Sequence, residues 1–272
     1  MAIDLAPFWD FGNPALSEER FRAALVSASA DDALILQTQI ARTHGLRRDF
    51  AKAREILAAV EPKLAGASAE ARVRFALELG RTHASATHPP QLQTPQERER
   101  ARTAYLQAYE LAKSERLDRL AIDALHMLAF VDTAPADQLK WGEQALALAL
   151  ASLQPQARAW EASLRNNVGY ALHQSGRHDE ALSQFTQALA LREEAGDAKA
   201  TGVASWMVAW TLRALGRTDE ALAIQLRLES ENEAATAPDP HVFDELEQLY
   251  RLKGDAVRAD AYAHKRGLVP LK

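Results

Sequence analysis

The chain of 272 residues contains 55 Ala and 37 Leu but only 12 Gly and 11 Pro, which favours helices over turn-rich β-sandwiches and barrels. The formal net charge of −5 gives no general attraction to nucleic acid or to anionic membranes. The absence of cysteine excludes disulfides, thiolate metal sites and cysteine nucleophiles. No secretory leader pattern and no run of 18 uncharged apolar residues occurs, so we expect a cytoplasmic protein without a membrane span.

In residues 1–30 we expect an N-terminal segment with one leading helix that begins near Ser17. The aromatic residues Phe8, Trp9 and Phe11 are expected to pack over that end of the fold. Apolar and small residues then recur with helical spacing, which predicts a solenoid domain over residues 31–266. Its predicted repeats lie near residues 31–65, 69–114, 117–152, 159–195, 199–234 and 240–266, and residues 267–272 remain as a C-terminal tail.

The clearest repeat is a seven-residue stretch that occurs twice. Gly176-Arg-His-Asp-Glu-Ala-Leu182 recurs as Gly216-Arg-Thr-Asp-Glu-Ala-Leu222, with six of seven residues identical and a spacing of 40. Before it, Val168, Gly169 and Leu172 share one face of a helix, and Gly176 then ends that helix. After it, the apolar stripe of a second helix contains Phe185. The unit is therefore predicted to be a helix–turn–helix hairpin in which the small Gly169 lets two helices approach closely.

These residues resemble the tetratricopeptide repeat. Val168-Gly169-x2-Leu172 and Ala181-x3-Phe185 follow the family pattern, although Arg165 replaces its leading Trp and its closing Pro is absent. A weaker copy is Leu79-Gly80-x2-His83 followed by Ala101-x3-Tyr105. The spacing near 40 exceeds the usual length of about 34 residues. It resembles the extended repeats of peptide-binding bacterial regulators and kinesin light chains.

The resemblance implies an all-α fold, an α-solenoid of about six antiparallel helix hairpins in a right-handed superhelix. It also implies that the first helix of each hairpin lines a concave groove suited to an extended peptide or a partner helix. Helical phase places Tyr170 on the exposed side of its helix. The equivalent column through the chain is Arg42, Arg81, His126, Tyr170, Trp210 and Gln248. A second column is Thr38, Leu77, Ile122, Asn166, Trp206 and Asp244, and Asn167 and His173 flank the columns.

We interpret these columns as a peptide-binding groove. Arg42 and Arg81 are expected to bind a carboxylate or an acidic residue. The amides of Asn166 and Asn167 can hold a peptide backbone, and an aromatic anchor pocket would be formed by Tyr170, Trp206 and Trp210. The alternatives are that Arg81 pairs with Glu78 three residues earlier, and that a neighbouring helix or a terminal loop covers the two Trp residues.

The function predicted from the sequence is an adaptor or regulatory receptor that binds a peptide or protein partner. The alternative is a scaffold that self-associates as a homo-oligomer through an edge or the convex face. A metal-dependent enzyme is a remote third interpretation: Asp123 and His126 share a helix face, but a metal site needs at least three ligands. We expect no catalytic residues, no cofactor, no metal and no nucleic-acid or membrane partner. The acidic residues 229–240 are expected to form a solvated connector.

Overall fold

The computed structural model describes residues 3–269, so the first two residues of the expected N-terminal segment and residues 270–272 of the expected tail lie outside the described residues. Within residues 3–269 every regular element is a helix and no strand occurs, which confirms the all-α class. None of the helices in this range combines the length and the apolar character needed to cross a lipid bilayer.

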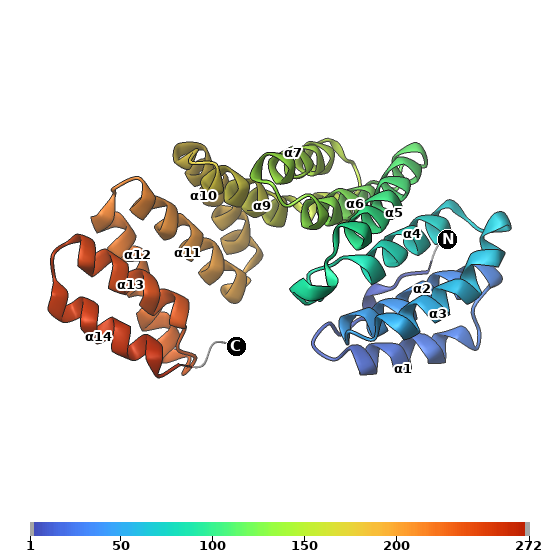
Figure 1. The fold of residues 1–272 in the computed structure, drawn as a ribbon, viewed down its shortest axis with the longest axis horizontal. Coiled ribbons are helices and arrows are strands. Elements are labelled where there is room, and N and C mark those ends of the chain that lie inside the picture. The colour runs from blue at the N-terminus through green and yellow to red at the C-terminus, as the bar shows by residue number, and fades with distance from the viewer. Residues whose placement is uncertain (1–2, 270–272) are drawn as a thin grey trace. The chain divides into compact units, whose positions relative to one another are not determined.

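The helices follow one another as antiparallel pairs after a leading helix, as Figure 1 shows. The leading helix α1 spans Pro14–Leu25, and the pairs are α2 (Ala30–Leu46) with α3 (Phe50–Val60), α4 (Ala69–His83) with α5 (Pro95–Ser114), α6 (Asp118–Val131) with α7 (Pro135–Ala151), α9 (Glu161–Gln174) with α10 (His178–Ala195), α11 (Ala198–Ala214) with α12 (Thr218–Ala234), and α13 (Pro240–Leu252) with α14 (Ala256–Gly267). A short helix, α8 (Pro155–Arg158), precedes α9. The chain is thus a helical-repeat protein of the α-solenoid class.

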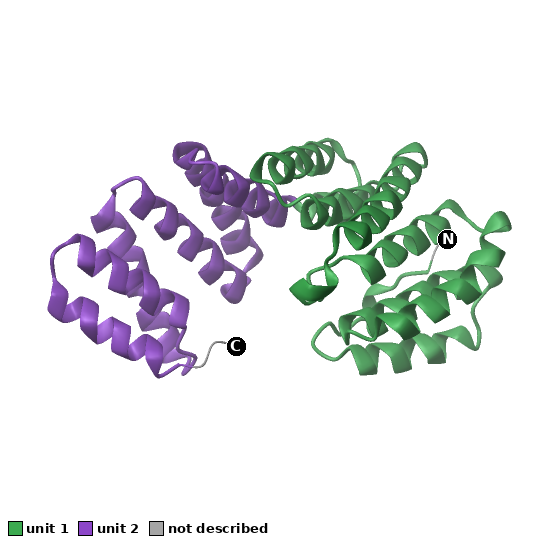
Figure 2. Ribbon diagram, in the orientation of Figure 1, with its two compact units in different colours: residues 1–160 green, residues 161–272 purple. Residues whose placement is uncertain are grey.

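The chain divides into two compact units, residues 1–160 and residues 161–272, which Figure 2 distinguishes by colour. Unit 1 contains α1 to α8 and unit 2 contains α9 to α14. The expectation of a single solenoid domain over residues 31–266 stays a prediction.

A close contact between a glycine and an aromatic ring fixes the geometry of two hairpins. A Cβ atom at Gly169 would lie 2.8 Å from a ring carbon of Phe185, and one at Gly80 would lie 2.5 Å from a ring carbon of Tyr105. Both rings are wholly buried. Because no other residue lets the helix backbone approach the ring so closely, α9 packs on α10 and α4 packs on α5 through these glycines.

Several of the turns within hairpins contain a residue in the left-handed backbone conformation. Gly176 and Gly216 have φ values of +76° and +74°, which confirms the predicted role of Gly176 in ending a helix. The turn between α2 and α3 uses Arg48 instead, at φ 64°. The sequence repeat is therefore clearest in unit 2, where glycine holds this position.

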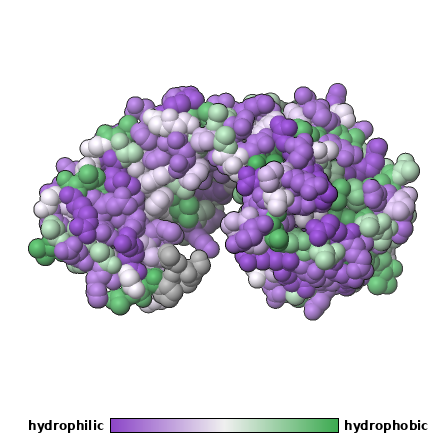
Figure 3. Space-filling view, in the orientation of Figure 1, coloured by the Kyte–Doolittle hydropathy of each residue, from purple (hydrophilic) through white to green (hydrophobic). Residues whose placement is uncertain are grey.

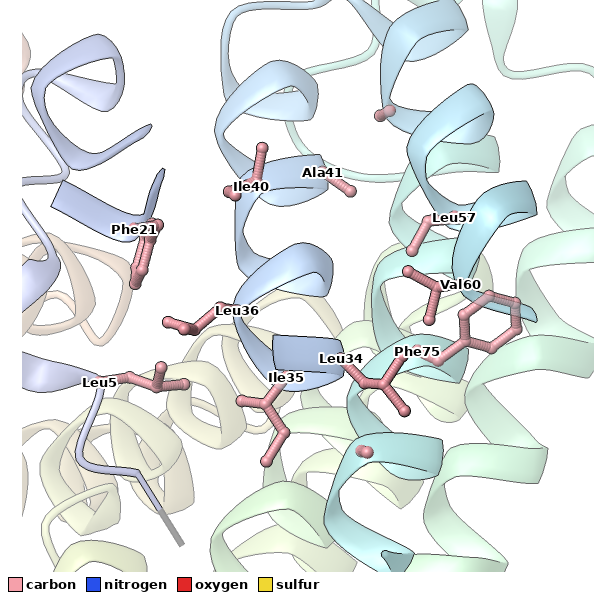
Figure 4. Packing of buried hydrophobic residues seen from close by; sticks show 12 residues of the cluster. Leu5, Phe21, Leu34, Ile35, Leu36, Ile40, Ala41, Leu57, Val60 and Phe75 are labelled. Carbon is pink, nitrogen blue, oxygen red and sulfur yellow. The ribbon is translucent and has the colours of Figure 1, made fainter. Parts of the chain in front are cut away.

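The first unit has a core built around α2. Figure 4 shows Phe21 and Leu5 on one side of α2, and Leu57 of α3 with Phe75 of α4 on the other side. The rings of Phe8 and Trp9 lie 5.6 Å and 5.0 Å from the ring of Phe21, centroid to centroid. The expected packing of Phe8 and Trp9 over this end is therefore confirmed. Phe11 stacks on Trp9 but remains 61% exposed.

Two local expectations are wrong. The leading helix begins at Pro14 and is capped by Asn13, while Ser17 lies buried inside it and bonds to Asp10. The acidic residues 229–240 are not a connector throughout, because α12 continues to Ala234. Glu229 within α12 is buried and accepts a hydrogen bond from the Tyr262 hydroxyl at 2.7 Å, which links α12 to α14. The start of α1 is set by a local cap, since the Asn13 side chain accepts a hydrogen bond from the Leu16 N–H and Pro14 begins the first turn. The last turns of α12 are instead stabilised by the contact of Glu229 with α14.

The helices present polar outer faces to solvent. On the face of the molecule drawn in Figure 3, hydrophilic residues predominate and hydrophobic residues form separate patches. The pattern agrees with amphipathic helices that bury one side against their neighbours.

We predict that Gly169→Leu destabilises the protein. The new side chain would collide with the buried Phe185 ring, and overpacking of this kind costs roughly 1–3 kcal/mol of unfolding free energy. Chemical denaturation monitored by circular dichroism measures the loss.

Gly202→Ala is the matched control, since a Cβ atom there would meet only Leu228 at 4.0 Å. Replacing an unconstrained helical glycine by alanine raises stability by up to about 1 kcal/mol. If Gly169→Leu is as stable as the wild type, the proposed glycine–aromatic contact does not fix the hairpin.

Candidate functional site

Two helices of unit 2, α9 and α11, carry a group of partly exposed aromatic residues. The ring of Trp210 in α11 lies 6.0 Å from that of Tyr170 in α9 and 3.3 Å from that of His173. Trp206, one turn earlier in α11, stacks on Trp210 at 5.7 Å. Its indole N–H donates a hydrogen bond to the backbone carbonyl of His241 in α13 at 3.2 Å. We call Tyr170, His173, Trp206 and Trp210 the aromatic cluster.

The aromatic cluster is only partly covered. Tyr170 is 42% exposed, and Trp206 and Trp210 are half-buried. The alternative in which a neighbouring helix or loop covers both Trp residues therefore holds only in part. Partly exposed aromatic side chains are common anchors of protein interfaces.

A pocket of about 720 Å³ lies beside Trp206. Its apolar wall is formed by Val203 and Met207 of α11, Leu228 of α12 and Val242 of α13. Its size lies within the range of about 300–1,000 Å³ typical of ligand sites. The pocket can therefore accept a bulky apolar side chain next to the indole.

A second, more polar pocket of about 350 Å³ adjoins the first, because both are lined by Lys199 and Val203. Asn166 and Asn167 of α9 lie in its wall together with Arg192 of α10. Among the described residues the amide of Asn166 has no hydrogen-bond partner, whereas Arg192 donates to Ser163. We call the two pockets together the unit 2 groove.

Burial keeps His173 neutral at physiological pH. Desolvation, followed by the positive fields of His178 and Arg213, lowers the pKa of His173 from 6.5 to about 4. The Nδ1 atom of His173 lies 3.1 Å from the Thr211 hydroxyl of α11. The neutral ring stacks on Trp210, so the aromatic cluster adds no charge to the groove.

The other predicted site residues lie together in unit 1. Arg42 of α2, Arg81 of α4 and His126 of α6 line one cavity of about 240 Å³. Arg81 donates to Glu78 at 2.6 Å and to Asp123 at 2.5 Å, so the alternative ion pair with Glu78 is present. Binding of an external carboxylate by Arg81 would compete with these two internal carboxylates.

The second predicted column is wrong in unit 1. Thr38, Leu77 and Ile122 are wholly or almost wholly buried and do not face a groove. Each of these residues lies on a helix that packs between neighbours, since α2 contacts α4 while α6 contacts α5 and α7. In unit 2 the equivalent Asn166 and Trp206 remain accessible in the groove.

Sequence reasoning missed several residues of these sites. Val203 lies three residues before Trp206 on the same helix face, so the helical period could have identified it. Lys199 and Arg192 had no comparable signal, nor did Trp160, which enters the cavity of unit 1 from the connection after α8. Within residues 3–269 no group of three or more His, Asp or Glu side chains is placed to hold a metal ion.

Residues 160–228 match the sequence model of the tetratricopeptide repeat. No protein of curated function is significantly similar to the chain in sequence. The chain resembles several solved structures in fold.

The crystal structure of the apo form of RapI superposes with a TM-score of 0.74 at 12% identity, over 96% of this chain and 74% of that chain. A Rap protein complexed with competence and sporulation factor gives 0.58 at 13% identity, over 96% and 72%. A kinesin light chain with nearly identical repeats from Podospora anserina gives 0.59 at 16% identity, over 77% and 99%. At sequence identities this low, the structural similarity shows a shared fold and nothing more.

We predict that His173 stays unprotonated well below pH 6. Its pKa of about 4 means that the unfolded chain, with a pKa near 6.5, takes up the proton first. Stability contributed by neutral His173 is therefore present above about pH 6.5 and lost as the pH falls towards 4. Titration of the imidazole signals by NMR measures this pKa, with His173→Gln identifying the signal. A midpoint near 6.5 for His173 would contradict the described burial.

Proposed function

Because residues 160–228 match the tetratricopeptide repeat, we propose that the chain binds a peptide or a protein segment in the unit 2 groove and acts as an adaptor or receptor. The observation that carries the proposal is the position of Trp206, beside an apolar pocket of about 720 Å³ and within a row of partly exposed aromatic rings. A groove of this kind takes an extended segment whose apolar side chain fills the pocket.

The chemistry of the adjoining pocket supports the same proposal. A peptide backbone offers alternating donors and acceptors, and the side-chain amides of Asn166 and Asn167 both donate and accept. The aromatic cluster supplies a rigid apolar surface that loses little entropy on binding. In this mode of binding, the amides on α9 bond to the backbone of the peptide, and one apolar side chain of the peptide fills the pocket beside α11.

The fold relatives support the proposal in a general way. One Rap protein of this fold was crystallised with competence and sporulation factor. The shared fold makes capture of a partner segment a reasonable activity for this chain, while the residues of its groove decide which segment binds.

Peptides selected from a random displayed library against the full chain provide a direct test. We predict that Trp206→Ala combined with Tyr170→Ala weakens binding of the selected peptides by roughly 30-fold or more. Trp206 lines the apolar pocket, and the loss of even one aromatic hot-spot residue costs about 2 kcal/mol. Fluorescence anisotropy measures the affinity, and circular dichroism checks that the helices are retained.

Tyr109→Ala is the matched control, since Tyr109 is a part-buried tyrosine of α5 in unit 1, outside the unit 2 groove. It should leave the affinity unchanged. Full affinity in the folded double variant would refute the groove assignment. A concentration-dependent oligomer in light scattering that persists in the double variant would favour the self-associating scaffold instead.

A further inference from the structure

Arg42 is a largely buried cation without a hydrogen bond. Its side chain is 25% exposed, and no described residue accepts a hydrogen bond from its guanidinium. The Nε atom is fully buried without a partner, and Nη1 lies 3.6 Å from Glu78 Oε1. The rings of Trp9 and Phe11 lie 5.5 Å and 5.6 Å from the guanidinium carbon. A buried guanidinium normally donates short, charge-assisted hydrogen bonds, and this long contact with Glu78 supplies none.

The neighbouring Arg81 has the opposite surroundings. Glu78 and Asp123 both bond to it, and the fields of these carboxylates raise its pKa despite its burial. For Arg42, burial and the field of Arg81 outweigh those carboxylates and lower the pKa. Asp123 and one Glu78 oxygen therefore accept hydrogen bonds from Arg81, while Arg42 keeps only a long ion pair with that same Glu78 oxygen. The other Glu78 oxygen is buried without a hydrogen-bond partner.

The cavity that Arg42 lines also has an apolar wall. Met127 and Phe130 of α6 and Trp160 contribute to it, and the ring of His126 makes edge contacts with Phe130 at 5.2 Å and Trp160 at 5.4 Å. The volume of about 240 Å³ lies below the usual range for drug-sized ligands. A group the size of a small aromatic acid or one terminal residue of a peptide fits such a space.

We propose that this cavity of unit 1 binds a carboxylate carried on a small apolar body, with Arg42 pairing with the carboxylate and with Phe130 and Trp160 against the body. The site is separate from the unit 2 groove and does not depend on the function proposed there. The carboxylate belongs either to a small organic acid or to the C-terminal residue of a peptide, since both offer the same chemistry.

The charge distribution favours an anion over a cation at this place. A cationic ligand would meet Arg42 while the nearest carboxylates are held by Arg81. A carboxylate next to Arg42 instead supplies the acceptor that the guanidinium lacks. His126 also lines the cavity. Burial lowers the pKa of its imidazole, so His126 adds no charge near neutral pH.

The experiment compares 3-phenylpropionate with its neutral amide, 3-phenylpropanamide, by isothermal titration calorimetry of the full chain. The wild type should bind the acid about tenfold more tightly or better, as expected for charge-assisted hydrogen bonds to a partly buried guanidinium. Arg42→Gln should remove this preference. Arg47→Gln is the matched control, because Arg47 is an exposed cation at the end of α2 that pairs with Glu18, and it should keep the preference.

Phe130→Ala provides a second variant that does not depend on a buried charge, since Phe130 is 38% exposed. It should weaken the acid and the amide by a similar factor and keep the preference for the acid. The tripeptide Gly-Gly-Phe and its C-terminal amide form the arm that distinguishes the two sources: tighter binding of the free peptide than of 3-phenylpropionate assigns the site to peptide C-termini, and the reverse assigns it to small acids.

Three results would overturn the proposal. They are the absence of binding by both 3-phenylpropionate and Gly-Gly-Phe, equal binding of acid and amide by the wild type, and an unchanged preference for the acid in folded Arg42→Gln. Unchanged affinity for the acid in Phe130→Ala would overturn the assignment of the apolar wall.

Discussion

The close approach of two helices within a hairpin is the constraint on which the other features depend. Helices of this length are marginal in water, and each hairpin leaves an apolar face that only a neighbour can cover. In α9 and α4 a glycine lets the helix backbone lie directly on a buried aromatic ring, Phe185 or Tyr105. Because this contact fixes which face of the first helix turns inward, it also fixes which residues remain at its surface.

The same framework presents different chemistry in the two units. In unit 1 the surface column holds Arg42, Arg81 and His126, and most of its charge is compensated internally by Glu78 and Asp123. In unit 2 the corresponding column holds aromatic rings that stack on one another and leave apolar surface accessible. One unit is therefore suited to a compact charged group and the other to an extended segment with an apolar side chain. The two proposed sites follow from what each column lacks: a hydrogen-bond acceptor for Arg42, and a cover for Trp206.

The sequence was sufficient for features that depend on local geometry. The period of apolar and small residues predicted paired helices, Gly176 predicted a left-handed turn, and Gly169 predicted a close contact. The first surface column is also in phase in α6, where His126 shares a cavity with Arg42 and Arg81.

Features that depend on the distance between helices could not be predicted in this way. Thr38, Leu77 and Ile122 have the helical phase of groove residues, yet the direct packing of α2 against α4 helps to bury this column. Asp123 lies 42 residues from Arg81, and no local pattern indicates that they pair. Trp160 likewise reaches its cavity from a connection without repeat character. Helical phase selects a face, while tertiary contacts decide whether that face is open.

The central claim is that the open face of α9, α11 and α13 is where a partner segment binds. The five Trp residues allow a direct measurement, because each indole N–H gives one signal in a proton–nitrogen correlation spectrum. Addition of a selected peptide should shift the signals of Trp206 and Trp210 and leave those of Trp9, Trp141 and Trp160 in unit 1 in place. A peptide that binds tightly while the signals of Trp206 and Trp210 do not move would contradict the account.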